Sequence, residues 1–280
     1  MQILQLINQG SEDLRCNEIL SQKLDSELIL SSLLSKQREN LLTHLDQEVS
    51  HKIVKNFKKL IARRSTREPM AYILKNKEFW SKNFFVNRNT LIPRPETELL
   101  SQKVIEIFKN KKIFILDVGT GTGCILLSIL SELKNCRGIG LDISKKAIDV
   151  AKINMKKHNL SSRSKFYVRQ FSNIYGYKFD LIVSNPPYIK NSDIKNLSDD
   201  IKKFEPKIAL NGGNDGLDVI KKIIYKSKTI LKKLGTLALE IGNGQHCKVS
   251  QILNDQGFRN KVLVKDYQNN IRCIIARLER

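Results

Sequence analysis

The chain has 280 residues, of which 41% are apolar, and its 49 Lys and Arg residues outnumber its 28 Asp and Glu residues, giving a formal charge of +21. This length and apolar fraction fit one large domain, or a medium domain with a smaller one, and they exclude global disorder. The five scattered cysteines include no Cys-x-x-Cys pair, which argues against a disulfide framework or zinc site and favours a reducing compartment.

The high positive charge has two interpretations. It is typical of proteins that bind nucleic acid or ribonucleoprotein, but overuse of Lys, Asn and Ile along a whole chain has the same effect. Because the excess is spread along the chain, the compositional interpretation is favoured, and we expect no stable nucleic-acid binding. No apolar run approaches about 18 residues and no signal-peptide pattern opens the chain, so we expect a cytoplasmic protein without a membrane span.

Residues 1–75 have a helical pattern, with apolar residues such as Leu20, Leu24 and Leu28 at steps of three and four. We predict a small helical bundle there. Residues 76–100 contain the alternating, Phe-rich stretch FWSKNFFVNRNTLIPRP, which predicts a linking β-hairpin. Pro93 and Pro95 end this segment, and a helix is expected to begin near Thr97.

Residues 101–280 alternate between strand-like and helix-like segments. The strand-like ones are KIFILDV, RGIGLDI, KFYV, FDLIVSN and GTLALEIG, followed by KVLVKD and IRCIIARL at the end of the chain. Such alternation predicts an α/β fold with a doubly wound, mainly parallel sheet, in which the last two strands form an antiparallel hairpin.

The first strand of this sheet ends at Asp117 and is followed by GTGTG at residues 119–123. Glycines here allow a tight turn and a close backbone approach to a ligand at the carboxyl end of the strand. The G-x-G-x-G spacing differs from the dinucleotide fingerprint, which argues against a pyrophosphate ligand. Asp142 ends the next strand, where a carboxylate either binds ribose hydroxyls or stabilises a helix N-terminus. The order of strand, glycine loop, helix, second strand and acidic residue favours nucleoside binding.

The sequence SNPPY at residues 184–188 closes the fourth strand on the same edge of the sheet. Asn185 offers a side-chain carbonyl and Pro186 a backbone carbonyl from a stiff segment, so together they can accept two hydrogen bonds from one –NH₂ group. Such a pair would orient a poorly nucleophilic amide or amine nitrogen for attack on a methyl group, while Tyr188 would pack against a planar group. The alternative is a turn that only caps the strand.

The pair DVGTGTG and NPPY resembles amino-group methyltransferases that depend on S-adenosylmethionine, both adenine-N6 and glutamine-N5 enzymes. REPMAYILKNKEFW, LIPRPETE and FEPKIALNGGNDGLDVI look like the family that methylates the glutamine of peptide chain release factors. The resemblance covers nearly the whole chain. It implies a Rossmann-like methyltransferase domain at residues 101–280, with residues 1–75 as a helical substrate-docking domain.

The resemblance also implies roles for individual residues. The implied cofactor contacts are Gly119, Thr120, Gly121, Thr122, Gly123, Asp142, Gln170, Phe171 and Asn185. Relatives tend to have an acidic residue and an aromatic before the third loop, where this chain has Arg169 and Gln170, so Phe171 is expected to replace the aromatic. The implied substrate contacts are Asn185, Pro186, Pro187 and Tyr188, of which Asn185 and Pro186 are the catalytic pair.

The implied cofactor is S-adenosylmethionine, with no metal, and the implied acceptor is the glutamine of a Gly-Gly-Gln loop in a release factor. We expect a monomer. The other interpretations are glutamine methylation of a ribosomal protein, adenine-N6 methylation of nucleic acid, and a non-catalytic RNA- or ribosome-binding module.

The sequence allows two roles for each of two further groups of residues. Arg94 and Glu98 either line the crevice or lock the linker by an ion pair. Glu205, Pro206, Gly212, Gly213 and Gly216 belong either to a flexible loop that covers the substrate or to a plain surface loop.

Overall fold

A computed structural model describes residues 1–279 of the chain, which form two compact units. The first contains Met1–Asn76 together with Ser198–Phe204, and the second contains Lys77–Leu197 and the chain from Glu205 onward. The predicted hairpin region thus lies in the same unit as the sheet. Among the described residues, no helix has both the length and the apolar character that a membrane crossing would need.

The first unit is helical, as predicted, and packs around an apolar core. Phe57 is central to this core, and its ring lies so close to Gly10 that a Cβ there would come within 2.6 Å of it. The helices are α1 (Ile3–Arg15), α2 (Gln22–Leu34), α3 (Arg38–Leu42), α4 (His51–Ser65), α5 (Met70–Leu74) and, from the later segment, α9 (Asp199–Phe204).

Charged side chains are also buried in the first unit. Arg64 on α4 is 8% exposed and donates from Nε to Asp25 Oδ2 at 2.7 Å. Its Nη1 atom donates to the Glu68 carbonyl at 3.1 Å and lies 3.6 Å from Asp200 Oδ2 on α9. Because a buried charge is costly unless it is paired, Arg64 fixes the relative positions of α2, α4 and α9.

The second unit begins with a short hairpin, β1 (Lys77–Phe79) and β2 (Lys82–Phe84). The hairpin is confirmed but shorter than predicted, because Asn154 captures the backbone beyond it. Phe85 N donates to Asn154 Oδ1 at 2.7 Å, and Asn154 Nδ2 donates to the Phe85 carbonyl at 3.0 Å. The chain therefore leaves the ladder at Phe85 and runs irregularly to α6 (Thr97–Phe108), which begins where predicted.

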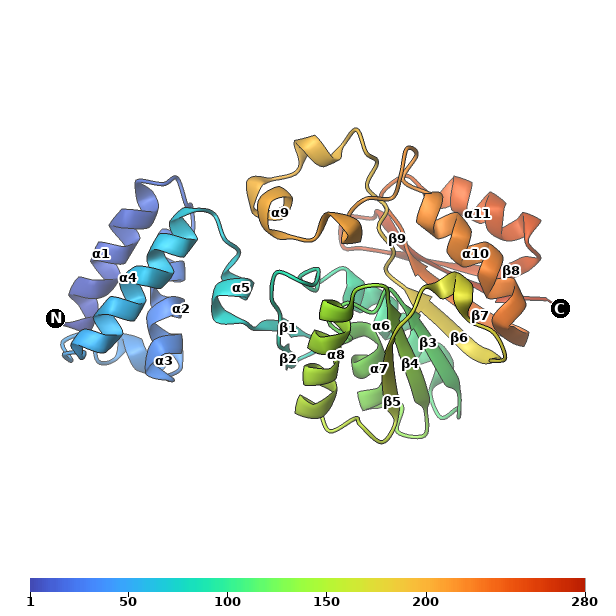
Figure 1. Cartoon of the computed structure of the whole chain (residues 1–280), viewed down its shortest axis with the longest axis horizontal. Helices are drawn as coiled ribbons and strands as arrows, with labels where there is room; N and C mark the ends of the chain where they lie inside the picture. The colour runs from blue at the N-terminus through green and yellow to red at the C-terminus, as the bar shows by residue number, and fades with distance from the viewer. Residues whose placement is uncertain (280) are drawn as a thin grey trace. The chain divides into compact units, whose positions relative to one another are not determined.

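A seven-stranded sheet follows, with strand order β5-β4-β3-β6-β7-β9-β8 (Figure 1). The first five strands in this order are parallel, and β9 pairs antiparallel with both β7 and β8, which confirms the predicted α/β topology. The strands are β3 (Phe114–Val118), β4 (Arg137–Asp142), β5 (Ser164–Val168), β6 (Phe179–Ser184), β7 (Leu231–Glu240), β8 (Phe258–Lys265) and β9 (Ile271–Leu278).

Helices cover both faces of this sheet, and alternate strand residues face each layer. On β3, Ile115 packs with α6, α7 and α8, whereas Leu116 packs with α10 and α11. The bounds of the covering helices are α7 (Cys124–Glu132), α8 (Lys145–Lys157), α10 (Asp218–Ile230) and α11 (His246–Asp255).

The parallel register aligns the ends of the four central strands. Cα partners across β4, β3, β6 and β7 form a row that consists of Leu141, Val118, Ser184 and Leu239. The next residue on each strand therefore falls at one edge of the sheet: Asp142, Gly119, Asn185 and Glu240. Ligands bind at this edge in open α/β sheets.

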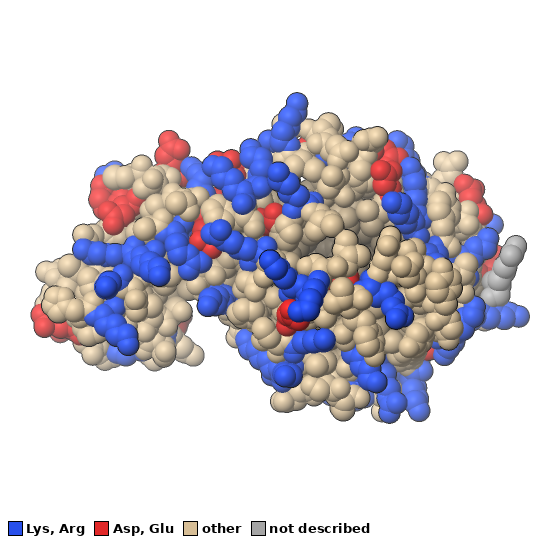
Figure 2. Space-filling view, in the orientation of Figure 1, with Lys and Arg blue, Asp and Glu red and all other residues tan. Residues whose placement is uncertain are grey.

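Figure 2 shows Lys and Arg side chains spread over the visible face of both units and interspersed with uncharged residues. This distribution agrees with an excess of basic residues along the whole sequence rather than in one segment.

Replacing Arg64 by Ala should lower the opening free energy of the first unit by about 3–5 kcal/mol, because the buried Asp25 would lose its positively charged partner and keep the Ser21 hydroxyl as a donor. Hydrogen exchange at amides of α2 and α4 measures this change. The matched control is Arg15→Ala, which breaks an exposed pair with Glu12 and should cost less than about 1 kcal/mol. Equal effects of the two substitutions would contradict a structural role for the buried pair.

Candidate active site

A cavity of about 780 Å³ lies in the second unit at the carboxyl edge of β3, β4 and β6. Its volume falls within the range of small-molecule sites, roughly 300–1,000 Å³. Its wall contains most of the polar residues that the sequence singled out, and also apolar side chains such as Leu141, Ile143, Ala147 and Ile223.

The glycine loop forms one wall of the cavity between β3 and α7. Gly119, Gly121 and Gly123 have φ values of 69°, 53° and 80°, a region that side chains disfavour, so glycine is favoured at each position. Thr120 N donates to the Leu141 carbonyl at 2.8 Å, which ties the loop to β4.

Asp142 links this loop to the start of α8. Its Oδ2 atom accepts from Gly121 N at 3.0 Å, and its Oδ1 atom accepts from Ser144 N at 2.9 Å. Burial raises the pKa of Asp142, and the two backbone donors act in the opposite direction. Each carboxylate oxygen retains a lone pair, so Asp142 can accept hydroxyl hydrogens while holding the loop.

Asp117 lies behind the glycine loop and is fully buried. Its Oδ2 atom accepts from Thr120 Oγ1 at 2.6 Å, whereas Oδ1 has no hydrogen-bond partner within residues 1–279. Burial raises the pKa of Asp117 to about 7. The loop is therefore anchored on a carboxyl group that loses its proton only near neutrality.

Asn185 and Pro186 follow the end of β6, and Asn185 lines the cavity. The Asn185 Nδ2 atom donates to Thr97 Oγ1 at 3.1 Å. Across the described part of the chain, neither Asn185 Oδ1 nor the Pro186 carbonyl accepts a hydrogen bond. These are the two acceptors that the sequence predicted; Asn185 lines the cavity, whereas Pro186 is buried and lies outside its lining.

Tyr188 does not line the cavity. Its ring packs at the edge of the core under α10 and α11, and its hydroxyl donates to Glu240 Oε1 at 3.2 Å. Gln245 donates from Nε2 to the Tyr188 and Gly216 carbonyls at 3.1 and 3.3 Å. Tyr188 and Gln245 thus hold the Asn-Pro-Pro-Tyr segment against β7 and the loop that contains Gly216.

The segment from Glu205 to Gly216 is fastened to the walls of the site. Glu205 is buried, accepts from Ile92 N at 3.0 Å and pairs with Arg94. A Cβ at Gly212 would lie 2.8 Å from Tyr188 Cα, so glycine permits close packing here. The sequence left open a flexible loop over the substrate or a plain surface loop; these contacts attach Glu205 and Gly212 to neighbouring segments, and Pro206, Ile208 and Ala209 line the cavity.

Arg94 and Glu98 have different positions and partners in the structure. Arg94 lines the cavity and also forms the ion pair with Glu205. Glu98 accepts from Trp80 N at 3.0 Å, which fastens the hairpin to α6, and it does not line the cavity.

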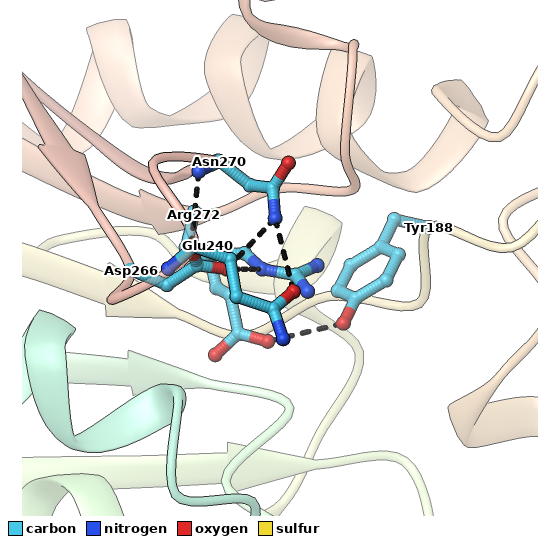
Figure 3. A network of polar contacts seen from close by, with 6 residues as sticks. Tyr188, Glu240, Asp266, Asn270 and Arg272 are labelled. Atoms are coloured by element: carbon cyan, nitrogen blue, oxygen red, sulfur yellow. Dashed lines mark hydrogen bonds and ion pairs between the residues drawn. The ribbon is translucent and has the colours of Figure 1, made fainter.

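Glu240 was missed in the sequence. It ends β7 with 2% exposure and accepts from Thr97 Oγ1 at 2.6 Å as well as from Tyr188. Figure 3 shows Glu240 with Tyr188 and Arg272, whose Nε atom donates to Asp266 Oδ2 at 2.9 Å. Burial raises the pKa of Glu240 to about 7, against the opposing hydrogen bonds from Thr97 and Tyr188. An acidic residue that ends the apolar run LALE was the available signal.

The structure brings most of the predicted site residues together around one cavity. Those that line it are Gly119, Thr120, Gly121, Thr122, Asp142, Gln170, Phe171, Asn185 and Pro187. Gly123, Pro186 and Tyr188 lie outside the lining. Lining residues that the sequence did not single out for contact include Thr97, Ile143 and Ser144.

The lining fits the adenosine cofactor that the sequence resemblance implied. Asp142 offers carboxylate oxygens that suit hydroxyl groups such as those of a ribose, and Ile143 and Phe171 offer apolar surface that suits a base. Within the described residues there is no cluster of three His, Cys, Asp or Glu side chains suited to a metal ion.

Family models and curated relatives both identify similarity to methyltransferases. A family model described as the PrmC N-terminal domain matches residues 5–74, and one described as a methyltransferase domain matches residues 109–241. The release factor glutamine methyltransferase of Clostridium botulinum is 39% identical over 276 residues, which is 97% of this chain and 98% of that protein.

A bifunctional methyltransferase of Rickettsia conorii is 36% identical over 98% of this chain, and the chain spans only 57% of that relative. A crystal structure of a methyltransferase from Pyrococcus furiosus has a TM-score of 0.52 at 15% identity, covering 69% of this chain and 87% of its own. At that identity the structural likeness shows the fold alone.

The two buried carboxyls predict how stability depends on pH. Asp117 and Glu240 lose their protons near pH 7 in the folded protein, against ordinary pKa values of 3.8 and 4.5. The folded protein therefore binds more protons than the unfolded chain between these values. Their contribution to the free energy of unfolding is complete below the lower values and is lost as the pH rises to about 7.

Asp117→Asn should flatten this decline by at most about 1.4 kcal/mol per pH unit, as measured by urea unfolding across the range. The control is Asp149→Asn, which changes an exposed carboxyl on α8. A decline that is equally steep in both variants and the unaltered protein would contradict the assignment to Asp117.

Proposed function

The chain belongs to the family of release factor glutamine methyltransferases, and we propose that it methylates the side-chain amide of the Gly-Gly-Gln glutamine in peptide chain release factors. The methyl donor in this proposal is S-adenosylmethionine. Since translation terminates in the cytoplasm, that is where the activity would take place.

The observation that carries the proposal is the pair of unoccupied acceptors at Asn185 Oδ1 and the Pro186 carbonyl. A primary amide has two N–H donors on one planar nitrogen, and it can satisfy both acceptors at once. A nitrogen held in this way cannot rotate, so its approach to an electrophile in the neighbouring cavity is fixed.

Residues of the glycine loop and the end of β4 would hold the cofactor. Asp142 would accept from the ribose hydroxyls, and Ile143, Gln170 and Phe171 would surround the base. S-adenosylmethionine, when bound, would supply a methyl group on a positively charged sulfur. The amide nitrogen would take this methyl group, the electron pair of the C–S bond would stay on sulfur, and one amide proton would pass to water.

The residues of this chain contribute position and electrostatics rather than a strong base. An amide nitrogen is a weak nucleophile because its lone pair is delocalised into the carbonyl group. Acceptors at Asn185 and Pro186 draw on both N–H groups and leave more electron density on nitrogen, an effect that grows as positive charge develops there. The helical region of residues 1–75 would dock the body of the release factor.

The direct test is the transfer of labelled methyl from S-adenosylmethionine to purified release factors. The Gly-Gly-Gln glutamine is either intact or replaced by Ala, and ribosomal proteins and DNA are offered in parallel. Label that depends on this glutamine supports the proposal. Label on a ribosomal protein or on DNA alone would overturn the proposed substrate, and no label on any of them would overturn the activity.

Asn185→Ala should reduce kcat about 100-fold or more, because the amide loses one of its two fixed acceptors. The dissociation constant for S-adenosylmethionine, measured by calorimetry, should change by less than about 3-fold, a change worth less than one ordinary hydrogen bond. Unchanged turnover in this variant would remove Asn185 from the catalytic role.

Asp142→Ala should weaken S-adenosylmethionine binding by about 10- to 100-fold, because charge-assisted hydrogen bonds to the ribose and the anchor for Gly121 are both lost. Calorimetric titration measures this effect. Asp149→Ala on the exposed side of α8 is the control and should bind normally. Equal affinities would place the ribose elsewhere.

A further inference from the structure

The side-chain amide of Asn185 presents opposite chemistry at its two ends. Oδ1 accepts hydrogen bonds and Nδ2 donates them, and the two ends are nearly equal in shape. Only one of the two orientations places an acceptor toward a substrate amide. The reversed orientation would set one –NH₂ group against another, so something must fix the amide in the productive orientation.

The hydrogen bonds behind Asn185 have one permitted direction. Glu240, when ionised, can only accept, so the single hydrogen of the Thr97 hydroxyl goes to Glu240 Oε2 at 2.6 Å. Thr97 Oγ1 is then left with lone pairs alone toward Asn185. Only Nδ2 can bind there, as it does at 3.1 Å, and Oδ1 must face away from Thr97.

Thr97 and Glu240, which form this series of hydrogen bonds, are buried and belong to regular secondary structure. Thr97 and Glu240 are each 2% exposed, so water does not replace either partner. Thr97 is the first residue of α6, and Glu240 is the last residue of β7. Tyr188 occupies the other oxygen of Glu240, so the carboxylate cannot turn away from Thr97 without losing that bond.

We propose that Glu240 is a positioning residue, which sets the orientation of the Asn185 amide through the hydroxyl of Thr97 and so keeps Oδ1 available to the substrate. Its catalytic consequence rests on the proposed function, whereas the orientation itself is a property of the protein without cofactor or substrate.

The charge on Glu240 is part of this arrangement. A protonated carboxyl could donate to Thr97, and Thr97 could then donate to Asn185 Oδ1 and reverse the amide. The titratable and charged groups that influence Glu240 from the surrounding elements are Glu96, Cys124, Tyr188, Arg272 and Cys273. Of these, the positive charge of Arg272 favours the ionised form of Glu240.

Four variants test the proposal. Thr97→Val keeps the shape and removes the hydroxyl, and Thr97→Ser keeps the hydroxyl. Glu240→Gln replaces the acceptor by a group that can also donate. Ser101→Ala is the matched control, since Ser101 lies one turn further along α6 and is equally buried, with no hydrogen-bond partner for its hydroxyl among the described residues.

The first readout is the side-chain ¹H–¹⁵N resonance pair of Asn185 in the free protein labelled on asparagine, assigned by its absence from Asn185→Ala. Thr97→Val and Glu240→Gln should shift this pair, whereas Thr97→Ser and Ser101→Ala should leave it in place. In the unaltered protein the pair should titrate near neutral pH, and Thr97→Val should abolish the titration. Retained binding of S-adenosylmethionine shows that each variant is folded.

The second readout is the methylation rate. Thr97→Val and Glu240→Gln should lower kcat at least about 10-fold, with little change in the affinity for S-adenosylmethionine, and Thr97→Ser should restore most of it. An Asn185 resonance unaffected by Thr97→Val and Glu240→Gln would overturn the proposal, whatever the activity. Shifted resonances with unchanged kcat would overturn the catalytic role of the orientation.

The two readouts separate failure of this proposal from failure of the proposed function. The resonance experiment needs no methyl acceptor, so it decides the orientation even if release factors are not the substrate. If the unaltered protein methylates no acceptor but the resonances shift as expected, the proposed function is wrong and the orienting role of Glu240 still stands.

Discussion

The parallel register of the four central strands is the constraint on which the site depends. The four strands end in one row, which consists of Leu141, Val118, Ser184 and Leu239. The residue that follows each of them therefore lies at the same edge of the sheet, and no long loop is needed to bring these residues together. A slip of one residue in any strand would turn its side chains to the opposite face. The packed layers on both faces of the sheet prevent such a slip, and the core therefore fixes the positions of the polar groups at its edge.

Three carboxylates, two of them buried and that of Asp142 partly buried, then determine how the polar groups at this edge are oriented. Asp117, Asp142 and Glu240 all accept hydrogen bonds from neighbouring loops, and burial raises the pKa of each. A buried carboxylate lowers stability unless donors surround it, so each one imposes a direction on the groups that contact it. Burial of these carboxylates lowers the stability of the protein, and the hydrogen bonds that they accept fix the arrangement of donors and acceptors around the cavity.

The sequence predicted the sheet, the glycine loop, Asp142 and the Asn-Pro-Pro-Tyr loop because each depends on residues close together in the chain. It missed the partnership of Thr97 with Glu240, which joins the start of one helix to the end of a distant strand and exists only after folding. The predicted hairpin is longer than the observed one for a similar reason. Asn154 on α8 forms hydrogen bonds with the backbone N–H and carbonyl of Phe85, which the local sequence pattern placed in a strand. The sequence also contains no sign that Glu205 and Gly212 contact distant segments, since both contacts exist only after folding.

The one-way chain of hydrogen bonds from Asn185 to Glu240 also limits how these positions can change over generations. A neutral residue at position 240 reverses or breaks the chain of hydrogen bonds while Thr97 remains, and a residue without a hydroxyl at position 97 removes one of the two donors to a buried carboxylate. Serine at position 97 keeps the hydroxyl and therefore preserves the order of donors. Asn185, Thr97 and Glu240 are therefore expected to covary across related sequences as one unit, although they come from three separate segments of the chain.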